Sequence, residues 1–393
     1  MRILLILRGN YHAGQEEFVH HNHLKNFTLD INDLRSLTGC ANPLPNHQKS
    51  LNYKYDNELY KLMLDFLQMR MKRGEFCVIN AYNEHLKTYK DLANLYRYKM
   101  FVIEFNANLE QCMANNLKQA SSTGYLTPFY LLENTANSLK KIPKKYEVLS
   151  PNNWQQILYE MPNLSTYKKI HHIGDIQGCY SVLKKYLKSM KDDEYYIFLG
   201  DYINRGIENG KVLKFLLKIC EKENVCLLEG NHERHLIKWA NGEVSTSKEF
   251  NENTLKDFYK EKLNPKDAKK LYPFFKECLF YKYGRKKILC SHAGLNFAPK
   301  KYQDLSFVSS YHLINGIDGY EDSQAIAEEF CKNSAENVFE VFGHRNKAKL
   351  PMQIASRVFL CEGKVDAGGY LRVLTLNKDG FKCIEVKNEV YRK

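Results

Sequence analysis

Short hydrophobic runs alternate with amphipathic stretches along most of the chain. In the first part, hydrophobic segments at 3–7, 76–79 and 100–105 predict strands, while 15–24 and 84–96 have the spacing of helices. Strands that alternate with helices favour a parallel α/β sheet with right-handed crossovers. We therefore predict an α/β domain at the front of the chain.

The alternation loosens in the middle of the chain. Pro151 and Pro162 interrupt the segment 146–168, so we predict a linker there. A length of 393 residues fits about two domains. The expected division is a first domain over 1–145 and a second over 169–393.

The second part resumes the alternation, and most of its predicted strands end next to a glycine and a polar side chain. The predicted strands are 170–173, 195–199, 224–228, 287–290 and 338–342, with helices at 180–190 and 210–221 and less regular, lysine-rich helical sequence over 250–278. A parallel α/β or α+β architecture follows for this part as well.

Composition limits the class of protein. The chain is 44% hydrophobic and 26% charged, which is ordinary for a globular protein. Its longest hydrophobic runs are too short to span a bilayer, and Arg8 and Gly9 end the first run before it reaches signal-peptide length. The eleven cysteines show no paired spacing, so we expect reduced thiols and a cytoplasmic location without a membrane partner.

A net charge of +13 leaves two interpretations open. It suits an anionic partner such as RNA. The lysines are nevertheless spread along the chain, which equally fits a plain soluble surface. The oligomeric state is not readable from these features.

Five short motifs after the predicted strands carry candidate metal ligands. Asp175 and Asp201 offer anionic oxygens, Asn231 a neutral oxygen, and His292 and His344 imidazoles. The carboxyl ends of parallel strands open on one edge of a sheet, so we expect these side chains to converge. The motifs are Gly-Asp-Ile-Gln-Gly at 174–178, Gly-Asp-Tyr-Ile-Asn-Arg-Gly at 200–206, Gly-Asn-His-Glu at 230–233, Ser-His-Ala-Gly at 291–294 and Gly-His at 343–344.

Each motif alone is also compatible with an ordinary βα turn, but all five in this order predict a binuclear metal site. Such a mixture of oxygen and nitrogen ligands suits Mn²⁺, with Fe²⁺ and Zn²⁺ as alternatives, better than Ca²⁺ or Mg²⁺. A carboxylate shared by two ions holds them about 3.5–4 Å apart and lowers the pKa of water between them.

On these motifs, the chain from about residue 170 onward resembles the calcineurin-like metallophosphoesterase superfamily. The residues of these motifs are similar to those of the branch that contains phosphoprotein phosphatases, diadenosine tetraphosphatases and bacterial RNA-repair phosphatases. The resemblance implies a βαβ sandwich that hydrolyses phosphate esters with two divalent ions. The implied ligands are Asp175, Gln177 and Asp201 for one ion, and Asp201, Asn231, His292 and His344 for the other.

The resemblance also implies catalytic roles. Arg205 would grip phosphate oxygens, which a guanidinium matches in bidentate fashion, and His232 would protonate the leaving group. Asn204 stands where many relatives have Asp, so it can orient the ring of His232 without adding charge. Asn231 lies beside the substrate position as well, and Arg345 is either a second phosphate contact or an exposed loop arginine.

Gln177 is a second departure, because many relatives have His at this position. An amide oxygen is a weaker ligand than imidazole, so we predict that the first ion is held more loosely.

The first domain has a glycine pair with the spacing of a phosphate-binding Walker A loop. Gly9 and Gly14 lie between the first predicted strand and helix. Gln15 replaces the lysine of that motif and Glu16 replaces its hydroxyl residue, and both changes oppose nucleotide binding. Nucleotide binding by this degenerate loop is therefore an open question.

More of the first domain is similar to the polynucleotide kinase family, at 30–35 and at 78–83. In active relatives an acidic base lies three residues before an arginine, and here that position holds Asn32. The resemblance implies a P-loop kinase-like fold that has lost kinase activity.

The leading hypothesis is a metal-dependent phosphohydrolase acting on phosphorylated nucleotides or RNA ends. Only the kinase-like first domain and the positive net charge favour a nucleic-acid substrate. Dinucleoside tetraphosphates and serine/threonine phosphoproteins are the alternative substrates. A protein of another class, a non-catalytic sensor of RNA ends or nucleotides, is the remaining alternative.

Overall fold

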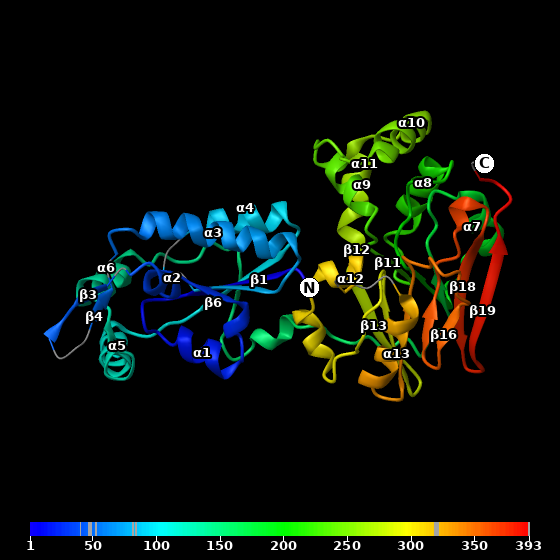
Figure 1. The fold of residues 1–393 in the computed structure, drawn as a ribbon. Coiled ribbons are helices and arrows are strands. Elements are labelled where there is room, and N and C mark those ends of the chain that lie inside the picture. Colours follow the sequence, from blue (N-terminus) through cyan, green and yellow to red (C-terminus); the bar gives the residue numbers. More distant parts are fainter. Residues whose placement is uncertain are drawn as a thin grey trace. The chain divides into compact units, whose positions relative to one another are not determined.

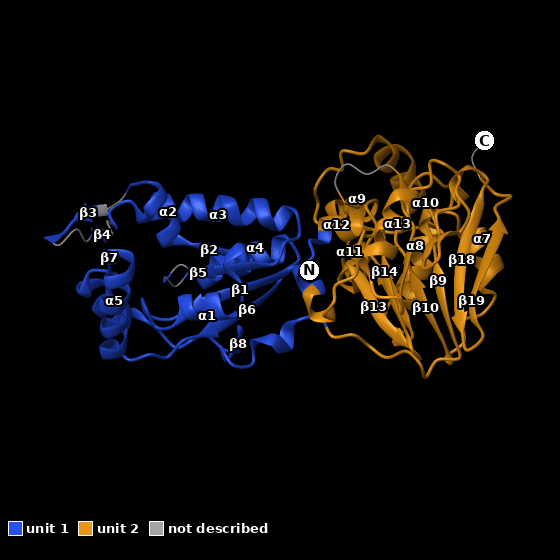
Figure 2. Ribbon diagram, turned by 60° about the horizontal axis from the view of Figure 1, so that its bottom comes forward, with its two compact units in different colours: residues 1–159, 305–310 blue, residues 160–304, 311–393 orange. Residues whose placement is uncertain are grey.

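The computed structural model describes residues 1–39, 41–45, 49–51, 53–80, 82, 85–317 and 322–391. The chain divides into two compact units, shown in different colours in Figure 2. Unit 1 consists of Met1–Tyr159 and Leu305–Ser310, and unit 2 of Glu160–Asp304 and Tyr311–Lys393. Ala81 and Asn83, which belong to one of the kinase-like motifs, lie outside the described residues.

Unit 1 is built on a five-stranded parallel sheet with the order β2-β5-β1-β6-β8. Its strands are β1 (Ile3–Arg8), β2 (Thr28–Asp30), β5 (Cys77–Asn80), β6 (Lys99–Glu104) and β8 (Glu147–Leu149). Because every residue of β1 is buried, hydrophobic side chains point to both faces of the sheet. β8 lies within the segment that was predicted to be a linker.

Helices cover both faces of this sheet (Figure 1). They are α1 (Gln15–His21), α2 (Ile31–Leu37), α3 (Asp56–Lys72), α4 (Leu86–Leu95), α5 (Leu109–Thr123) and α6 (Phe129–Ser138), and a small second sheet contains β3 (Ala41–Pro43), β4 (Lys49–Leu51) and β7 (Tyr125–Leu126). Helix α3, which the sequence analysis did not include, buries Leu59, Met63, Leu67 and Met71 at four-residue spacing.

Unit 2 contains two sheets. The six-stranded sheet has the order β12-β11-β10-β9-β18-β19, and the five-stranded sheet has the order β13-β14-β15-β17-β16. The strands are β9 (Lys169–Ile173), β10 (Glu194–Phe198), β11 (Val225–Leu228), β12 (Phe275–Lys276), β13 (Cys278–Tyr283), β14 (Lys286–Ser291), β15 (Val338–Phe342), β16 (Gln353–Ala355), β17 (Val358–Leu360), β18 (Tyr370–Asn377) and β19 (Gly380–Lys387).

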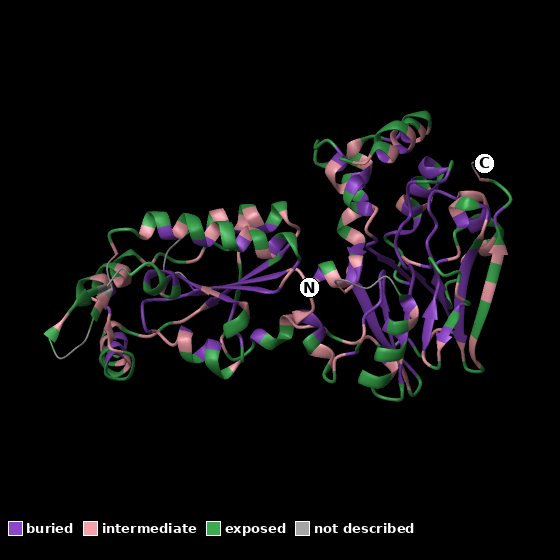
Figure 3. Ribbon diagram, viewed as in Figure 1, coloured by how far each residue is buried: buried purple, intermediate pink, exposed green. Residues whose placement is uncertain are grey.

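One hydrophobic core lies between the two sheets and a second lies under the helices. The inter-sheet core joins Ile197 of β10 and Leu228 of β11 to Ile288 of β14 and Val341 of β15. The second core packs the six-stranded sheet against α7 (Tyr180–Leu187), α8 (Asn209–Ile219) and α9 (Glu233–Ala240). Most strands are therefore buried, as Figure 3 shows. The remaining helices are α10 (Leu255–Lys260), α11 (Pro265–Leu271), α12 (Ser310–Asn315) and α13 (Ser323–Asn333).

The two-sheet arrangement corrects one expectation. All five motifs were expected at the edge of a single sheet, but β14 and β15 belong to the second sheet. Burial explains the difference, because two stacked sheets can hide the hydrophobic face of each other. Within the described residues, no helix is both long and apolar enough to cross a membrane.

Candidate metal centre

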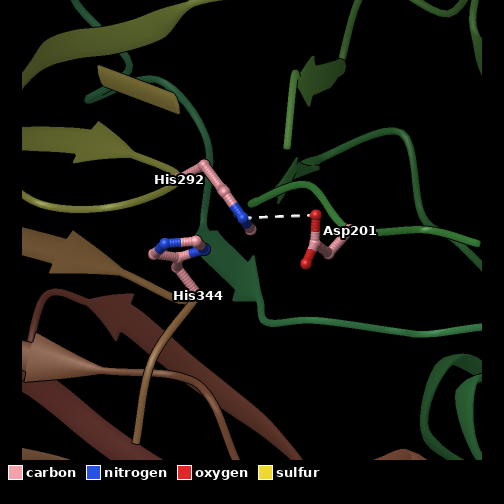
Figure 4. A group of neighbouring side chains, drawn as sticks. All are labelled: Asp201, His292 and His344. Atoms are coloured by element: carbon pink, nitrogen blue, oxygen red, sulfur yellow. Dashed lines mark ion pairs between the residues drawn. The ribbon is translucent and has the colours of Figure 1, made fainter. Parts of the chain in front are cut away.

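The five predicted ligand motifs all follow strands in unit 2. Asp175, Asp201 and Asn231 lie just beyond β9, β10 and β11 of the first sheet, and His292 and His344 lie just beyond β14 and β15 of the second. The structure brings Asp201, His292 and His344 together, with one ligand atom from each within 4.8 Å of the others (Figure 4). Asp201 follows a strand of the first sheet, whereas His292 and His344 follow strands of the second.

The loops that hold these side chains are conformationally restricted. Positive φ angles occur at Gln177 (46°), Asp201 (51°), Asn204 (76°), Arg205 (62°) and His344 (70°). Non-glycine residues in this region cost on the order of 1 kcal/mol or more each, so surrounding contacts must hold them there. Such a concentration of strained residues is typical of functional sites.

Close approach of backbones requires glycine beside the ligands. A Cβ atom on Gly343 would lie 2.0 Å from Oδ1 of Asp175, and one on Gly230 would lie 2.2 Å from the backbone nitrogen of Asp201. Any larger residue would displace a candidate ligand, which explains why glycine is part of these motifs.

His292 provides the strongest test of whether a cation fits here. Its Nδ1 lies 2.8 Å from the carbonyl oxygen of Leu199, to which it donates a hydrogen bond. In the neutral ring Nε2 therefore carries a lone pair. Nε2 lies 3.2 Å from Oδ1 of Asn231 and 3.3 Å from Oδ1 of Asp201, so three lone pairs converge in a buried space. A divalent cation at this point satisfies all three.

The carboxyl group of Asp201 is stabilised as an anion. Burial opposes its ionisation, but the charges of His292 and His232 lower its pKa well below the usual value. Asp201 Oδ1 also accepts a 3.0 Å hydrogen bond from the backbone nitrogen of His232. The group is thus held as a carboxylate at the centre of the site.

The second part of the site contains Asp175 and Gln177. Nε2 of Gln177 donates to Oδ2 of Asp201 at 2.9 Å, and its Oε1 is buried with no hydrogen-bond partner among the described residues. A buried amide oxygen without a hydrogen-bond donor destabilises the folded protein by about 1–3 kcal/mol, and a cation would satisfy this oxygen. The carboxylate of Asp175 accepts from the backbone nitrogen of His344 at 3.1 and 3.2 Å. These residues fit a first cation.

Two buried glutamates complete the site, and the sequence analysis did not identify them. Glu233 accepts hydrogen bonds from the backbone nitrogens of Asp201, Tyr202 and Gly230. Burial and then the charge of Asp201 raise the pKa of Glu233 to about 8. The sequence signal that could have identified Glu233 is its position at the end of the Gly-Asn-His-Glu motif.

Glu362 is the other, and no motif marked it. Burial, followed by the charges of Glu362 and Asp201, raises the pKa of Asp175 well above its usual value. A site with this excess of buried carboxylates favours divalent cations.

His232 is positioned by Asn204. Nδ2 of Asn204 lies 2.8 Å from Nδ1 of His232, and Oδ1 of Asn204 accepts a 2.7 Å hydrogen bond from the hydroxyl of Thr254. In this arrangement Nδ1 accepts, so the ring proton is on Nε2, which lies 3.8 Å from Oδ2 of Asp201.

The same contacts can support the protonated ring. If the Asn204 amide turns over, its oxygen accepts from Nδ1, and the hydroxyl of Thr254 accepts from Nδ2. Burial, the largest effect, lowers the pKa of His232, Asp201 raises it, and Arg205 lowers it again, with a net decrease. Because the Asn204 amide is uncharged, it does not raise the pKa of His232 to offset this decrease.

The two candidate phosphate contacts differ. Arg205 is exposed and, within the described residues, donates no hydrogen bond and forms no ion pair, so its guanidinium is available to an anion beside the site. Arg345 is half-buried rather than an exposed loop residue, and its Nε lies 3.0 Å from Nε2 of His344. Burial and then the charge of His292 lower the pKa of His344 to about 3.

In unit 1 the glycine loop is folded onto itself. Gly14 has a φ of 111° and precedes α1, and Gln15 is buried with Nε2 donating to the carbonyl of Asn10 at 2.9 Å. Gly9 packs closely against Gln15 and Phe105. The side chain of Gln15 therefore contacts its own loop.

The fold and the ligand set of unit 2 define a class of protein, and comparison with known families agrees. Residues 168–367 match the calcineurin-like phosphoesterase family, and the chain belongs to that family. Members generally use divalent metals, and the convergent ligands described above fit that use.

Relatives that match include symmetrical bis(5'-nucleosyl)-tetraphosphatases. The symmetrical bis(5'-nucleosyl)-tetraphosphatase of Wigglesworthia glossinidia brevipalpis is 35% identical over 128 residues, which is 31% of this chain and 43% of the relative. The enzyme of the same name from Buchnera aphidicola subsp. Acyrthosiphon pisum (strain 5A) is 31% identical over 137 residues, 34% of this chain and 45% of the relative. The chain spans about half the length of the curated relatives it matches.

A solved protein serine/threonine phosphatase from Saccharomyces cerevisiae has a TM-score of 0.41 and 14% identity, covering 61% of this chain and 86% of that one.

Proposed function

We propose that the protein is a metal-dependent phosphohydrolase that hydrolyses phosphate monoesters of nucleotides or RNA ends at the unit 2 centre. The observation that carries the proposal is the convergence of lone pairs from His292, Asn231 and Asp201 at 3.2–3.3 Å. When two divalent cations are bound, preferably Mn²⁺, they supply Lewis-acid stabilisation and a water of lowered pKa.

The side chains of the protein supply the rest of the reaction. The exposed guanidinium of Arg205 binds the phosphoryl oxygens and orients the ester. His232, once protonated, donates its Nε2 proton to the leaving oxygen, while Asn204 and Thr254 hold the ring. Asn231 would offer its Oδ1 to a cation beside His292 and is also a predicted substrate contact.

A nucleotide or RNA substrate is supported by unit 1. Its five parallel strands, counted along the chain, have the order 2-3-1-4-5, and the glycine loop follows the central strand at the point where the order reverses. We propose that unit 1 is a degenerate P-loop kinase-like domain. Gln15 and Glu16 replace the groups that hold phosphate and Mg²⁺, which supports loss of kinase activity.

A dinucleoside tetraphosphate is the second candidate substrate. The names of the matching relatives favour it, although the similarity covers less than half of the two relatives described. A serine/threonine phosphoprotein is the third. A non-catalytic sensor would have little need of the converging cation ligands.

One assay separates these possibilities. Initial rates with Mn²⁺ are compared for 3'-phosphorylated RNA, a dinucleoside tetraphosphate, a phosphopeptide and an aryl phosphate, with Asp201→Ala as the blank. The proposal predicts the highest kcat/KM for the 3'-phosphorylated RNA and a loss on the order of 10³-fold in the blank. Rates that remain equal in Asp201→Ala and the unchanged protein would contradict a metal-dependent reaction.

A further inference from the structure

Unit 1 contains a cavity of about 600 Å³ at the carboxyl edge of its sheet. Asp30 at the end of β2, Asn80 at the end of β5 and Glu16 of α1 contribute to its wall. The lining also includes Gln119, which contacts Glu16, and Tyr125. A cavity of this volume suits a small organic molecule.

We propose that this cavity is a binding site for a small organic ammonium ion. The carboxylates of Glu16, Asp30 and Asp33 line it, whereas Lys25 is its only lysine or arginine among the described residues. Lys25 is already paired with Asp33 at 2.7 Å, so Glu16 and Asp30 are the remaining acidic groups of the described lining. The cavity is thus acidic although the whole chain carries a net charge of +13.

The two carboxylates are held in place by neutral donors. Asp30 is buried and accepts hydrogen bonds from the backbone nitrogen of Asn32 and from Nδ2 of Asn80, both at 2.8 Å. Glu16 accepts from the hydroxyl of Tyr82 at 3.3 Å and from Nε2 of Gln119. These donors are neutral, and within the described residues neither carboxyl group forms an ion pair. Burial therefore raises the pKa of Glu16 and raises that of Asp30 to about 7.

A second observation is independent of the acidic groups. Asn80 lines the cavity and is fully buried, and its Oδ1 has no hydrogen-bond partner among the described residues. Its Nδ2 donates to Asp30 and lies 3.0 Å from the hydroxyl of Tyr82, which fixes the amide with its oxygen unsatisfied. A buried acceptor without a donor costs about 1–3 kcal/mol, so a ligand that donates hydrogen bonds is favoured here.

An organic cation fits better than a metal ion or a phosphate. Within the described residues, the only group of three His, Cys, Asp or Glu ligands close enough for a metal is in unit 2. Phosphate is disfavoured because Glu16 replaces the residue that would hold its magnesium, and Gln15 replaces the lysine. An ammonium group matches several acceptors at once, and the lining contains one aromatic side chain among the described residues besides its histidines, that of Tyr125.

Calorimetric titration of the full chain with spermidine tests the proposal. Glu16→Gln and Asp30→Asn preserve the shape of each side chain and, for Asp30, a good helix N-cap, but remove one charge. Each is expected to weaken spermidine binding by about tenfold or more. Asp91→Asn removes the same charge from the exposed surface of α4 and is expected to bind spermidine normally.

Other outcomes overturn the assignment. Unchanged spermidine affinity in both cavity variants, with thermal unfolding showing that each is folded, would exclude the site. Binding that is lost in Asp201→Ala instead would place spermidine in unit 2. Binding of ATP–Mg, or of Mn²⁺ in an Asp201→Ala background, that disappears in Glu16→Gln would show that the cavity takes a phosphate or a metal. Since binding is measured, the result does not depend on phosphatase activity.

Discussion

The two units place polar residues at the carboxyl edges of parallel strands but use them in opposite ways. In unit 2, Asp201, His292 and Asn231 direct lone pairs at one another, although Oδ1 of Asp201 also accepts from the backbone nitrogen of His232. In unit 1, Gln15 and Glu16 are held by Asn10, Tyr82 and Gln119, within their own domain. Unit 2 thus directs several ligand atoms at one point, whereas the glycine loop of unit 1 directs the amide nitrogen of Gln15 at its own backbone.

The difference shows that a loop at the end of a strand does not by itself carry chemistry. Parallel sheets bring strand ends together in both units because of their topology. Activity requires, in addition, side chains whose hydrogen-bonding needs are met only by a ligand. The predictions below test this distinction in order of expected effect.

Replacement of the proposed general acid should have the largest effect. His232→Asn is expected to lower kcat by on the order of 10²–10⁴-fold for a nucleotide monoester, because the leaving oxygen loses its proton donor. The drop should be smaller for an aryl phosphate, whose leaving group needs no proton. Steady-state rates for both substrates measure it, and an equal loss for both would argue against the acid role.

A stronger ligand at the first cation position should tighten metal binding. Gln177→His replaces an amide oxygen with imidazole, and we expect about tenfold tighter Mn²⁺ binding by competition with a metal-sensitive dye. Gln111→His, on the exposed face of α5, is the matched control and should leave the affinity unchanged. Unaltered affinity in Gln177→His would remove this residue from the ligand set.

Adding a charge beside His232 should shift the pH dependence without removing activity. Burial lowers the pKa of His232, so the protonated acid is lost as pH rises through a depressed value. Asn204→Asp introduces a carboxylate at the position now 2.8 Å from Nδ1, which raises this pKa. The basic limb of the kcat profile should move to higher pH, and a profile that stays in place would contradict the contact.

The smallest effect is expected in unit 1. Gln15→Lys introduces the lysine that a Walker A loop has at this position. In the proposed degenerate loop, Glu16 would still repel phosphate and occupy the place of the hydroxyl that holds magnesium in that motif. Titration with ATP–Mg should therefore show no gain in affinity. Micromolar binding of ATP–Mg by Gln15→Lys would contradict this expectation, because one substitution would then be enough to give unit 1 a nucleotide site like the cation site proposed for unit 2.

Much of the metal centre was readable from the chain. The strand at 338–342 was predicted with the bounds of β15, and the motifs after it and after β9, β10, β11 and β14 identified the candidate ligands. These signals are local, because a hydrophobic run and the glycine after it depend on neighbouring residues. Helix α3 was missed although Leu59, Met63, Leu67 and Met71 carried its period.

Sequence by itself therefore determined the strands that precede the five motifs and the chemical types of the candidate ligands. Only the tertiary structure decided that these ligands come from two sheets, that Glu233 and Glu362 lie beneath them, and that Thr254 orients the amide of Asn204. The physical reason is that such contacts join residues far apart in the chain, and their geometry is set by how the hydrophobic faces pack rather than by local pattern.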